Sequence, residues 1–328
     1  MKNELCYYCN VTAFKSIIEN HSFWLSDIHY MNDSSEESLF LDALTEVMIN
    51  QREQLSTQTK EHLDSDTFMN SFFTNIKNNY KNFVYICCFS DSNNDDLSQW
   101  RGYADDGKGV CIGLKKDKIK KLSDWNMIVL NGDGHKEYAA HNYVFAQRNI
   151  IYSDKSEIIS ELKEKVTPLV REYDASDKKT VVPPIPDSSF TIKLYNETFN
   201  YKSFYKNKSF QSENEYRICF YDKLHHEALE IPGDALKNNM QKKYQIKDDS
   251  QKEVVEFSEL KFRESKNYLI PYRIMKFEAS FFKDLISSIT IGPKNPMSEN
   301  DIKYFLVANG FDISNPNINV EKSKSTYQ

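Results

Sequence analysis

The clearest pattern in the chain is a strict alternation of side chains over residues 213–220. The charged members are Glu213, Glu215 and Arg217, and the apolar members between and after them are Tyr216, Ile218 and Phe220. A period of two predicts a β-strand whose apolar side chains share one buried face. The charged side chains then share the other face, either as an ion-paired solvent surface or as part of a polar site.

Glu213 and Glu215 are the more informative pair in this stretch. Two carboxylates at this spacing on one strand lie side by side and repel unless a cation, a proton or a polar ligand holds them. Such a pair suits a site that binds hydroxyls or stabilises a developing positive charge. In the simpler alternative, Arg217 only neutralises Glu215.

Elsewhere, apolar residues recur at helical or strand spacing without a regular alternation of the two. Helices are predicted at residues 12–20, 67–80, 97–104, 156–173, 191–204 and 299–309, and the capping-box pattern Ser34-x-x-Glu37 begins another. Strands are predicted at residues 5–9, 23–25, 83–90, 110–114, 125–130, 254–262, 269–277 and 286–291. This mixture indicates an α+β fold. We expect one domain over residues 1–328, with a helical insertion at 34–82 and a proline-rich loop or linker at 178–188.

Composition narrows the class of protein. The 328 residues include 13% aromatics and carry a net charge of −6. A globular protein is expected, and broad non-specific adhesion to nucleic acid or membrane is disfavoured. No stretch resembles a signal peptide or a membrane span, so we expect a cytoplasmic protein with no membrane partner, whose six cysteines are free thiols.

The sequence contains incomplete matches to two familiar motifs, a phosphate-binding loop and a cysteine metal site. Residues 102–108 match the first seven positions of a phosphate-binding P-loop, but Gly109 replaces the required Ser or Thr and a strand follows. A tight turn is predicted there. Cys6 and Cys9 form one C-x-x-C pair without a second pair, and the histidines show no ligand spacing, so no metal site is predicted.

Several short segments, taken together, carry a family resemblance. They are Tyr7-Tyr8, Trp24-Leu25-Ser26 and residues 32–36; Cys88-Phe89-Ser90 with residues 100–104 and 109–113; residues 206–210 with Glu213-x-Glu215-x-Arg217; and residues 289–293. In this order the chain resembles a bacterial family known as domain of unknown function 2971. That family in turn resembles the ADP-ribosyltransferases, whose fold is a split antiparallel sheet that grips NAD in a cleft.

The resemblance implies roles for individual residues. Glu215 takes the place of the late catalytic Glu, Glu213 is the first acid of E-x-E, and Tyr103 occupies the middle position, where a ring stacks on nicotinamide. The remaining implied cofactor contacts are Tyr7, Tyr8, Trp100, Arg101 and Arg217. Tyr7 or Tyr8 stands where an early Arg or His is expected, so Arg101 or Arg217 could supply that cation from elsewhere. Trp100 and Tyr103 could alternatively be core residues.

The implied function is NAD-dependent ADP-ribosyl transfer to a macromolecular acceptor, protein or nucleic acid, or hydrolysis of NAD. NAD is then a substrate and no metal is needed. The implied context is phage defence or a toxin, with a regulatory or antitoxin partner. Two alternatives stay open: a non-catalytic binding or sensor module on the same fold, and a nucleic-acid-directed enzyme that uses residues 115–121 as a basic face. The first reading requires Tyr7, Tyr103 and Glu215 to converge on one cleft.

Because no ligand spacing is present, any activity should persist in a strong chelator. Cys6→Ser and Cys9→Ser should each cost about 1 kcal/mol of stability, as ordinary packing losses do. Activity assays with and without chelator, and metal analysis of the purified protein, check this. Stoichiometric zinc, or activity that a divalent ion restores after chelation, would point instead to a site at Cys6, Cys9 and the region of His135 and His141.

Overall fold

A computed structural model describes residues 3–31, 36–57, 84–92, 95–131, 136–139, 144–175, 193–194, 201–222, 237, 240–265, 267–313 and 318–327. Its α-helices are α1 (Val11–Asn20), α2 (Glu36–Arg52), α5 (Leu97–Tyr103), α6 (Lys116–Lys121), α7 (Lys155–Asp174), α10 (Ala279–Leu285) and α11 (Glu299–Ala308). Short 3-10 helices are η1 (Ile28–Tyr30) and η4 (Lys208–Glu213). The predicted helix at residues 67–80 and the linker at 178–188 lie outside the described residues.

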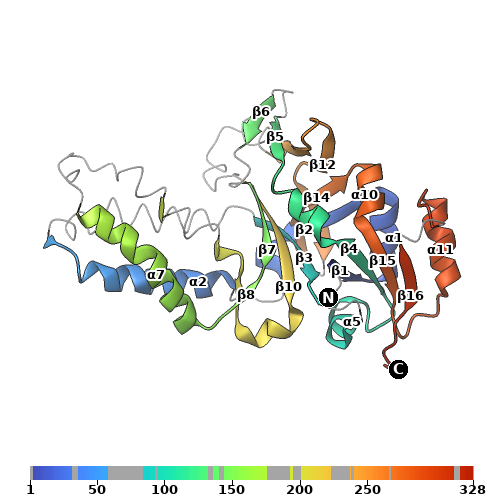
Figure 1. Cartoon of the computed structure of the whole chain (residues 1–328), viewed down its shortest axis with the longest axis horizontal. Coiled ribbons are helices and arrows are strands. Elements are labelled where there is room, and N and C mark those ends of the chain that lie inside the picture. The colour runs from blue at the N-terminus through green and yellow to red at the C-terminus, as the bar shows by residue number, and fades with distance from the viewer. Residues whose placement is uncertain are drawn as a thin grey trace.

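The strands described form one large sheet and a separate two-stranded ribbon (Figure 1). They are β1 (Glu4–Cys9), β2 (Ser22–Asp27), β3 (Val84–Ser90), β4 (Val110–Lys115), β5 (Asn126–Leu130), β6 (Lys136–Ala139), β7 (Phe145–Asn149), β8 (Ile151–Tyr152), β9 (Tyr205–Lys206), β10 (Glu215–Tyr221), β11 (Lys243–Lys247), β12 (Glu253–Phe257), β13 (Lys261–Ser265), β14 (Tyr268–Phe277), β15 (Ile286–Ile291) and β16 (Asn319–Lys322). The sheet runs β16-β15-β4-β1-β3-β2-β14-β12-β11-β5-β6, with β10, β7 and β13 branching from it. The α+β class is therefore confirmed.

Helices α1, α10 and α11 cover one face of this sheet and enclose the main core. Their buried side chains include Phe14, Ile18, Phe282 and Leu306, which join apolar side chains of most central strands. On the opposite face, α5 packs Trp100 against Cys6 and Tyr8 of β1. The cavity described below is lined in part by α5.

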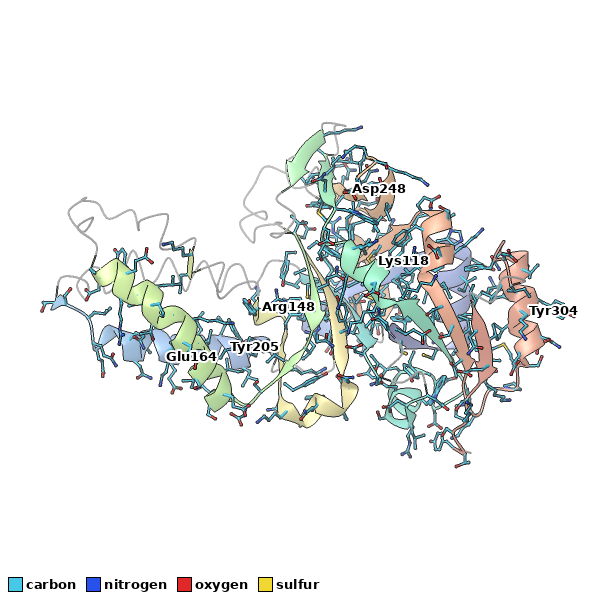
Figure 2. All side chains as sticks on the ribbon, in the orientation of Figure 1. Lys118, Arg148, Glu164, Tyr205, Asp248 and Tyr304 are labelled. Atoms are coloured by element: carbon cyan, nitrogen blue, oxygen red, sulfur yellow. The ribbon has the colours of Figure 1, made fainter. Side chains whose placement is uncertain are left out.

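A second, smaller core lies away from the sheet, where α2 and α7 pack together as an arm (Figure 1). Capping by Asp154 starts α7 close to the position predicted for it. Tyr205 of β9 stacks on Phe40 of α2 with ring centroids 5.2 Å apart. Tyr205 and Arg148 mark the junction between the arm and the sheet in Figure 2. β9 therefore ties the arm to the neighbourhood of β10.

One edge of β3 has two different strand partners. β1 pairs with it at a single position, Cys6 with Ser90, although β1 pairs along its whole length with β4. β2 pairs with β3 only at Ser26–Ile86 and Asp27–Tyr85. Between these contacts, residues 87–89 have no strand partner on that edge within the described part of the chain, while their other edge pairs with β10. The sheet thus opens in its middle.

Several expectations from the sequence need correction. The strand predicted at residues 254–262 is two strands, β12 and β13. Most of the helix predicted at residues 191–204 lies outside the described residues, and the chain enters β9 at Tyr205. The tight turn in place of a P-loop is confirmed: α5 ends, Asp105, Asp106 and Gly107 take left-handed backbone angles, and β4 begins at Val110. Near the C-terminus, residues 319–322 form β16, which pairs in parallel with β15.

Gly109 lies where this turn meets β1, and only a hydrogen fits there. A Cβ on Gly109 would overlap the carbonyl oxygen of Cys9, and it would crowd the carbonyl of Ala104. Gly109→Ala should therefore destabilise the protein by about 2–4 kcal/mol, as strained or overpacked substitutions do. Gly102→Ala is the matched control, because nothing lies within 4 Å of its Cβ position and alanine favours the α5 helix. Denaturant unfolding of both variants tests this, and equal stabilities would contradict it.

Candidate functional site

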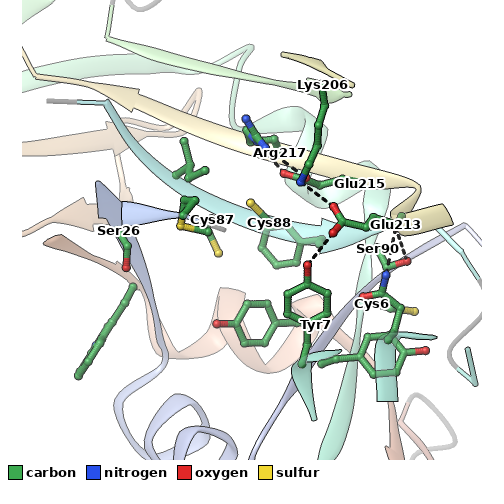
Figure 3. A pocket seen from close by; sticks show the side chains of 17 residues that line it. Cys6, Tyr7, Ser26, Cys87, Cys88, Ser90, Lys206, Glu213, Glu215 and Arg217 are labelled. Atoms are coloured by element: carbon green, nitrogen blue, oxygen red, sulfur yellow. Dashed lines mark hydrogen bonds and ion pairs between the residues drawn. The ribbon is translucent and has the colours of Figure 1, made fainter. Parts of the chain in front are cut away.

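A cavity lies at the opening of the sheet, and its empty space is about 880 Å³ including the mouth. Its walls come from β1, β2, β3, β9, β10, α5 and the end of η4 (Figure 3). Cys87, Cys88 and Phe89, the β3 residues without a partner on one edge, all line it. Missing strand pairing therefore creates the space that a ligand could occupy.

Glu215 and Arg217 lie on the cavity face of β10 and are both buried. Arg217 Nε donates to Glu215 Oε1 at 2.6 Å, and Arg217 also donates to the other carboxylate oxygen at 3.1 Å and to the Ser203 carbonyl at 2.8 Å. Burial alone would raise the pKa of Glu215, but Arg217 and Lys206 outweigh it and lower that pKa to about 2. Glu215 is thus a fixed carboxylate, and of the two alternatives left open for this face of β10, the solvent surface is excluded.

Glu213 is placed differently from the sequence expectation. It ends η4 and is not part of β10, because Asn214 between the two acids adopts a left-handed conformation with φ 42°. Asp91 holds this turn: its N–H donates to the Asn214 carbonyl, and its carbonyl accepts from Asn214 Nδ2, both at 2.7 Å. Glu213 therefore does not share a pleated face with Glu215 but reaches the cavity from a separate turn.

Lys206 holds the two carboxylates together. Its Nζ lies 2.6 Å from Glu213 Oε2 and 3.4 Å from Glu215 Oε2, and its side chain is buried (Figure 3). A cation thus compensates the repulsion expected between two close acids, which is one of the three possibilities that the sequence left open. Glu213 remains the more accessible of the two, with 20% of its side chain exposed against 6% for Glu215. The two acids therefore have distinct environments.

The aromatic candidates divide into two groups. Tyr103 donates its hydroxyl to Glu213 Oε1 at 2.8 Å, and burial together with this bond raises the Tyr103 pKa. Tyr7 and Tyr8 also line the cavity; Tyr7 packs against Phe23 and Phe89, and Tyr8 accepts a hydrogen bond from the Asp96 N–H. Tyr7, Tyr103 and Glu215 accordingly line one cavity, although they are far apart in sequence.

The other two predicted cofactor contacts do not line the cavity. Trp100 is fully buried between α5 and β1, where its Nε1 donates to Asp95 at 2.8 Å. Arg101 is on the outer side of α5, with its guanidinium 5.1 Å from the Tyr327 ring. Trp100 therefore has the core role that the sequence left open, and Arg101 contacts the C-terminal tail.

Several cavity residues were missed as site residues from the sequence, and four of them offer polar or flat aromatic groups. They are Trp24, Ser26, Gln99 and Lys206. Gln99 precedes Tyr103 by one helical turn on α5 and donates to the Glu213 carbonyl at 3.3 Å. Helical spacing from Tyr103 could have identified Gln99, but no local signal shows that Lys206 pairs with both acids.

The cysteines around the cavity are poor nucleophiles. Burial raises the pKa values of Cys87 and Cys88, and the Glu215 carboxylate raises them further. The reactive form of cysteine is the thiolate, which these surroundings disfavour. Cys6 and Cys9 are three residues apart on β1, so their side chains point to opposite faces and pack in separate clusters. Carboxylates, not thiols, are the chemical groups poised in this cavity.

The remaining predicted features can be placed as well. Lys115 pairs with Asp284 at 2.7 Å, Lys118 pairs with the same acid, and Lys116 pairs with Asp91, so carboxylates neutralise much of the basic run at residues 115–121.

No group of three His, Cys, Asp or Glu that could hold a metal ion occurs among the described residues. In the same part of the chain, no helix is both long and apolar enough to cross a bilayer.

Comparison with known proteins gives one match. The model of a family described as protein of unknown function (DUF2971) matches residues 99–218, and no curated protein or solved structure matches the chain. The matched segment begins at Gln99 and ends in β10. It contains the polar cavity residues Gln99, Tyr103, Lys206, Glu213, Glu215 and Arg217. The similarity therefore covers one wall of the cavity.

The low pKa of Glu215 predicts an acid-sensitive contribution to stability. An unfolded Glu binds its proton near pH 4.3, whereas folded Glu215 stays ionised until about pH 2. Between these values the unfolded state takes up a proton that the folded state does not, so stability falls as the pH drops. Denaturant unfolding between pH 6 and pH 3 should show a steeper loss for the native chain than for Glu215→Gln. Parallel pH profiles would contradict this.

Proposed function

We propose that the protein cleaves the bond between nicotinamide and ribose in NAD and transfers ADP-ribose to a macromolecular acceptor or to water. The observation that carries this proposal is the carboxylate pair: Glu215, buried and ionised, beside the more exposed Glu213, in a cavity lined by tyrosines. Glycosidic chemistry commonly uses two carboxylates in unlike environments.

Glu215 supplies the electrostatic part of the reaction. As the bond from ribose C1′ to the nicotinamide nitrogen breaks, its electron pair leaves with nicotinamide and the ribose becomes oxocarbenium-like. A carboxylate held in a preorganised, water-poor position stabilises that positive charge and can accept a bond from a ribose hydroxyl. Arg217 and the Tyr152 hydroxyl, which accepts the Glu215 N–H at 2.7 Å, hold Glu215 in place.

Glu213 serves the acceptor. Its greater exposure allows an incoming hydroxyl, amine or water to approach it. The acceptor atom forms the new bond to C1′, and the proton that it loses passes to the Glu213 carboxylate. Tyr103 and Lys206 orient that carboxylate from opposite sides. Flat, weakly polar nicotinamide suits the rings of Tyr7 and Tyr103.

The opening of the sheet also supports this proposal. In the ADP-ribosyltransferase fold, NAD occupies the cleft of a split antiparallel sheet, and here the cavity lies where β1 and β2 leave β3 unpaired. The late E-x-E acids fall at this opening. A phage-defence enzyme or a toxin is the biological context that we propose for such an activity.

A second candidate function, a non-catalytic sensor, is favoured by a specific observation. Glu213 and Glu215 are each paired with cations of the protein itself, Lys206 and Arg217. Such a charge-balanced cavity can bind a polar ligand without reacting with it. Activity measurements distinguish the two.

Glu215→Gln should lower nicotinamide release from NAD by about a hundredfold or more, through loss of the charge that stabilises the transition state. Glu213→Gln should reduce transfer of labelled ADP-ribose to lysate macromolecules more than it reduces nicotinamide release. Purified variants with NAD labelled in the adenosine half give both readouts. Unchanged release and transfer in both variants would favour the sensor.

Glu215→Gln, although isosteric, should affect stability as well as activity. The substitution leaves buried Arg217 without its carboxylate, which typically costs about 3–5 kcal/mol. Asp222→Asn is the matched control, because it removes the carboxylate partner of buried Arg273 on the opposite sheet face. Both variants are assayed below their unfolding temperatures, and only Glu215→Gln should lose activity.

A further inference from the structure

Cationic side chains around the cavity differ in whether carboxylates already engage them. Arg217 and Lys206, inside the cavity, are paired with its two acids. Arg263, on β13, is different. It forms no ion pair within the described part of the chain, and its one hydrogen bond there runs from Nη2 to Ser26 Oγ at 3.3 Å. A guanidinium has five N–H donors, so most of its capacity is unused.

The strand register places Arg263 beside the cavity. Arg263 pairs with Ile270, and Tyr272 of the same β14 strand pairs with Ser26 of β2. Residues paired across strands share a face, and so do residues two apart along a strand, so Arg263, Tyr272 and Ser26 lie on one face. Ser26 itself lines the cavity. Arg263 is half-buried, and its Nε is enclosed with no partner.

Trp24 presents a flat surface on the same sheet face, two residues from Ser26 along β2. It lines the cavity, yet 44% of it is exposed. The Tyr272 ring supports it from one side, with centroids 4.7 Å apart and planes 32° apart. Trp24 and Ser26 are two residues apart on β2, hence about 7 Å apart. That separation is comparable to the span from a base to its own phosphate.

We propose that Arg263, Ser26 and Trp24 form a nucleotide subsite at the edge of the cavity, in which Arg263 binds a phosphate and Trp24 stacks on a base. Arginine is suited to bidentate phosphate binding, and an exposed indole face stacks on any base. With NAD as the source of the nucleotide, the inference rests on the proposed function, and Arg263 then supplies the cation sought at Arg101 or Arg217. A nucleic-acid acceptor strand is the other source of the same chemistry.

The neighbouring Lys261 provides a matched control. It lies on the same strand and the same face as Arg263, so its removal changes the local charge equally. Its ammonium is already paired with Glu259 at 2.7 Å. A ligand bound by general electrostatics would respond to both substitutions, whereas a ligand bound by the subsite would respond only to the loss of Arg263.

The test is equilibrium binding to the full chain, without any reaction. Adenosine diphosphate, a mixed-sequence single-stranded DNA oligonucleotide and nicotinamide are titrated separately by calorimetry against the native chain, Arg263→Gln, Lys261→Gln and Trp24→Ala. Arg263→Gln should weaken binding of a phosphate-bearing probe by about tenfold or more, because a hydrogen bond to a charged group typically contributes that much to affinity. Lys261→Gln should change the affinity for that probe by less than about twofold. Trp24→Ala should weaken binding, because the base loses the indole ring on which it stacks. Unfolding curves verify that each variant is folded.

The probes separate the two sources of nucleotide. A response confined to adenosine diphosphate indicates the dinucleotide, and one confined to the oligonucleotide indicates an acceptor strand; either supports the subsite. Equal binding by the native chain and Arg263→Gln, or no binding of either probe by the native chain, would overturn it. Because no bond is cleaved, a chain that binds adenosine diphosphate through Arg263 but never releases nicotinamide would refute the proposed function and leave the subsite standing.

Discussion

Strand β3 must pair with two diverging strands along one edge, and the rest of the site depends on this constraint. β1 meets β3 at Ser90 and β2 meets it at Tyr85 and Ile86, so the residues between have no neighbour on that side. Their other edge stays paired with β10, which keeps the strand extended. The sheet can therefore open without losing its continuity. Polar side chains from several elements then converge on the opening.

Charge compensation makes this convergence possible. Buried carboxylates and cations are costly unless they are paired and hydrogen-bonded. The cavity balances two acids with two cations: Arg217 binds Glu215 from the same strand, and Lys206 bridges Glu215 to Glu213 from β9. On the opposite sheet face, Arg273 and Asp222 form a separate buried pair. The cavity acids remain reachable from solvent through Glu213, whereas both members of the Arg273–Asp222 pair are buried.

Much of the local structure could be predicted from the sequence. Amphipathic spacing located α1, α7 and α11, and apolar runs located β3, β4 and β15, because burial of one face decides these elements locally. The turn after α5 followed from its acids and Gly107. Short or polar strands such as β7, β11 and β16 were not predicted, because their strand conformation comes from pairing with a neighbouring strand and not from their own composition.

The sequence by itself determined that residues 216, 218 and 220 are buried and that the two acids need a cation, a proton or a polar ligand nearby. The family resemblance added the expectation that Tyr7, Tyr103 and Glu215 line one cleft. Only the tertiary structure decided which cation pairs with the two acids and which aromatic side chains line the cavity. Lys206 comes from another strand, Trp100 turns inward against β1, and Glu213 leaves the strand because Asn214 is left-handed. These outcomes depend on contacts between segments far apart in the chain, and no spacing along the sequence records them.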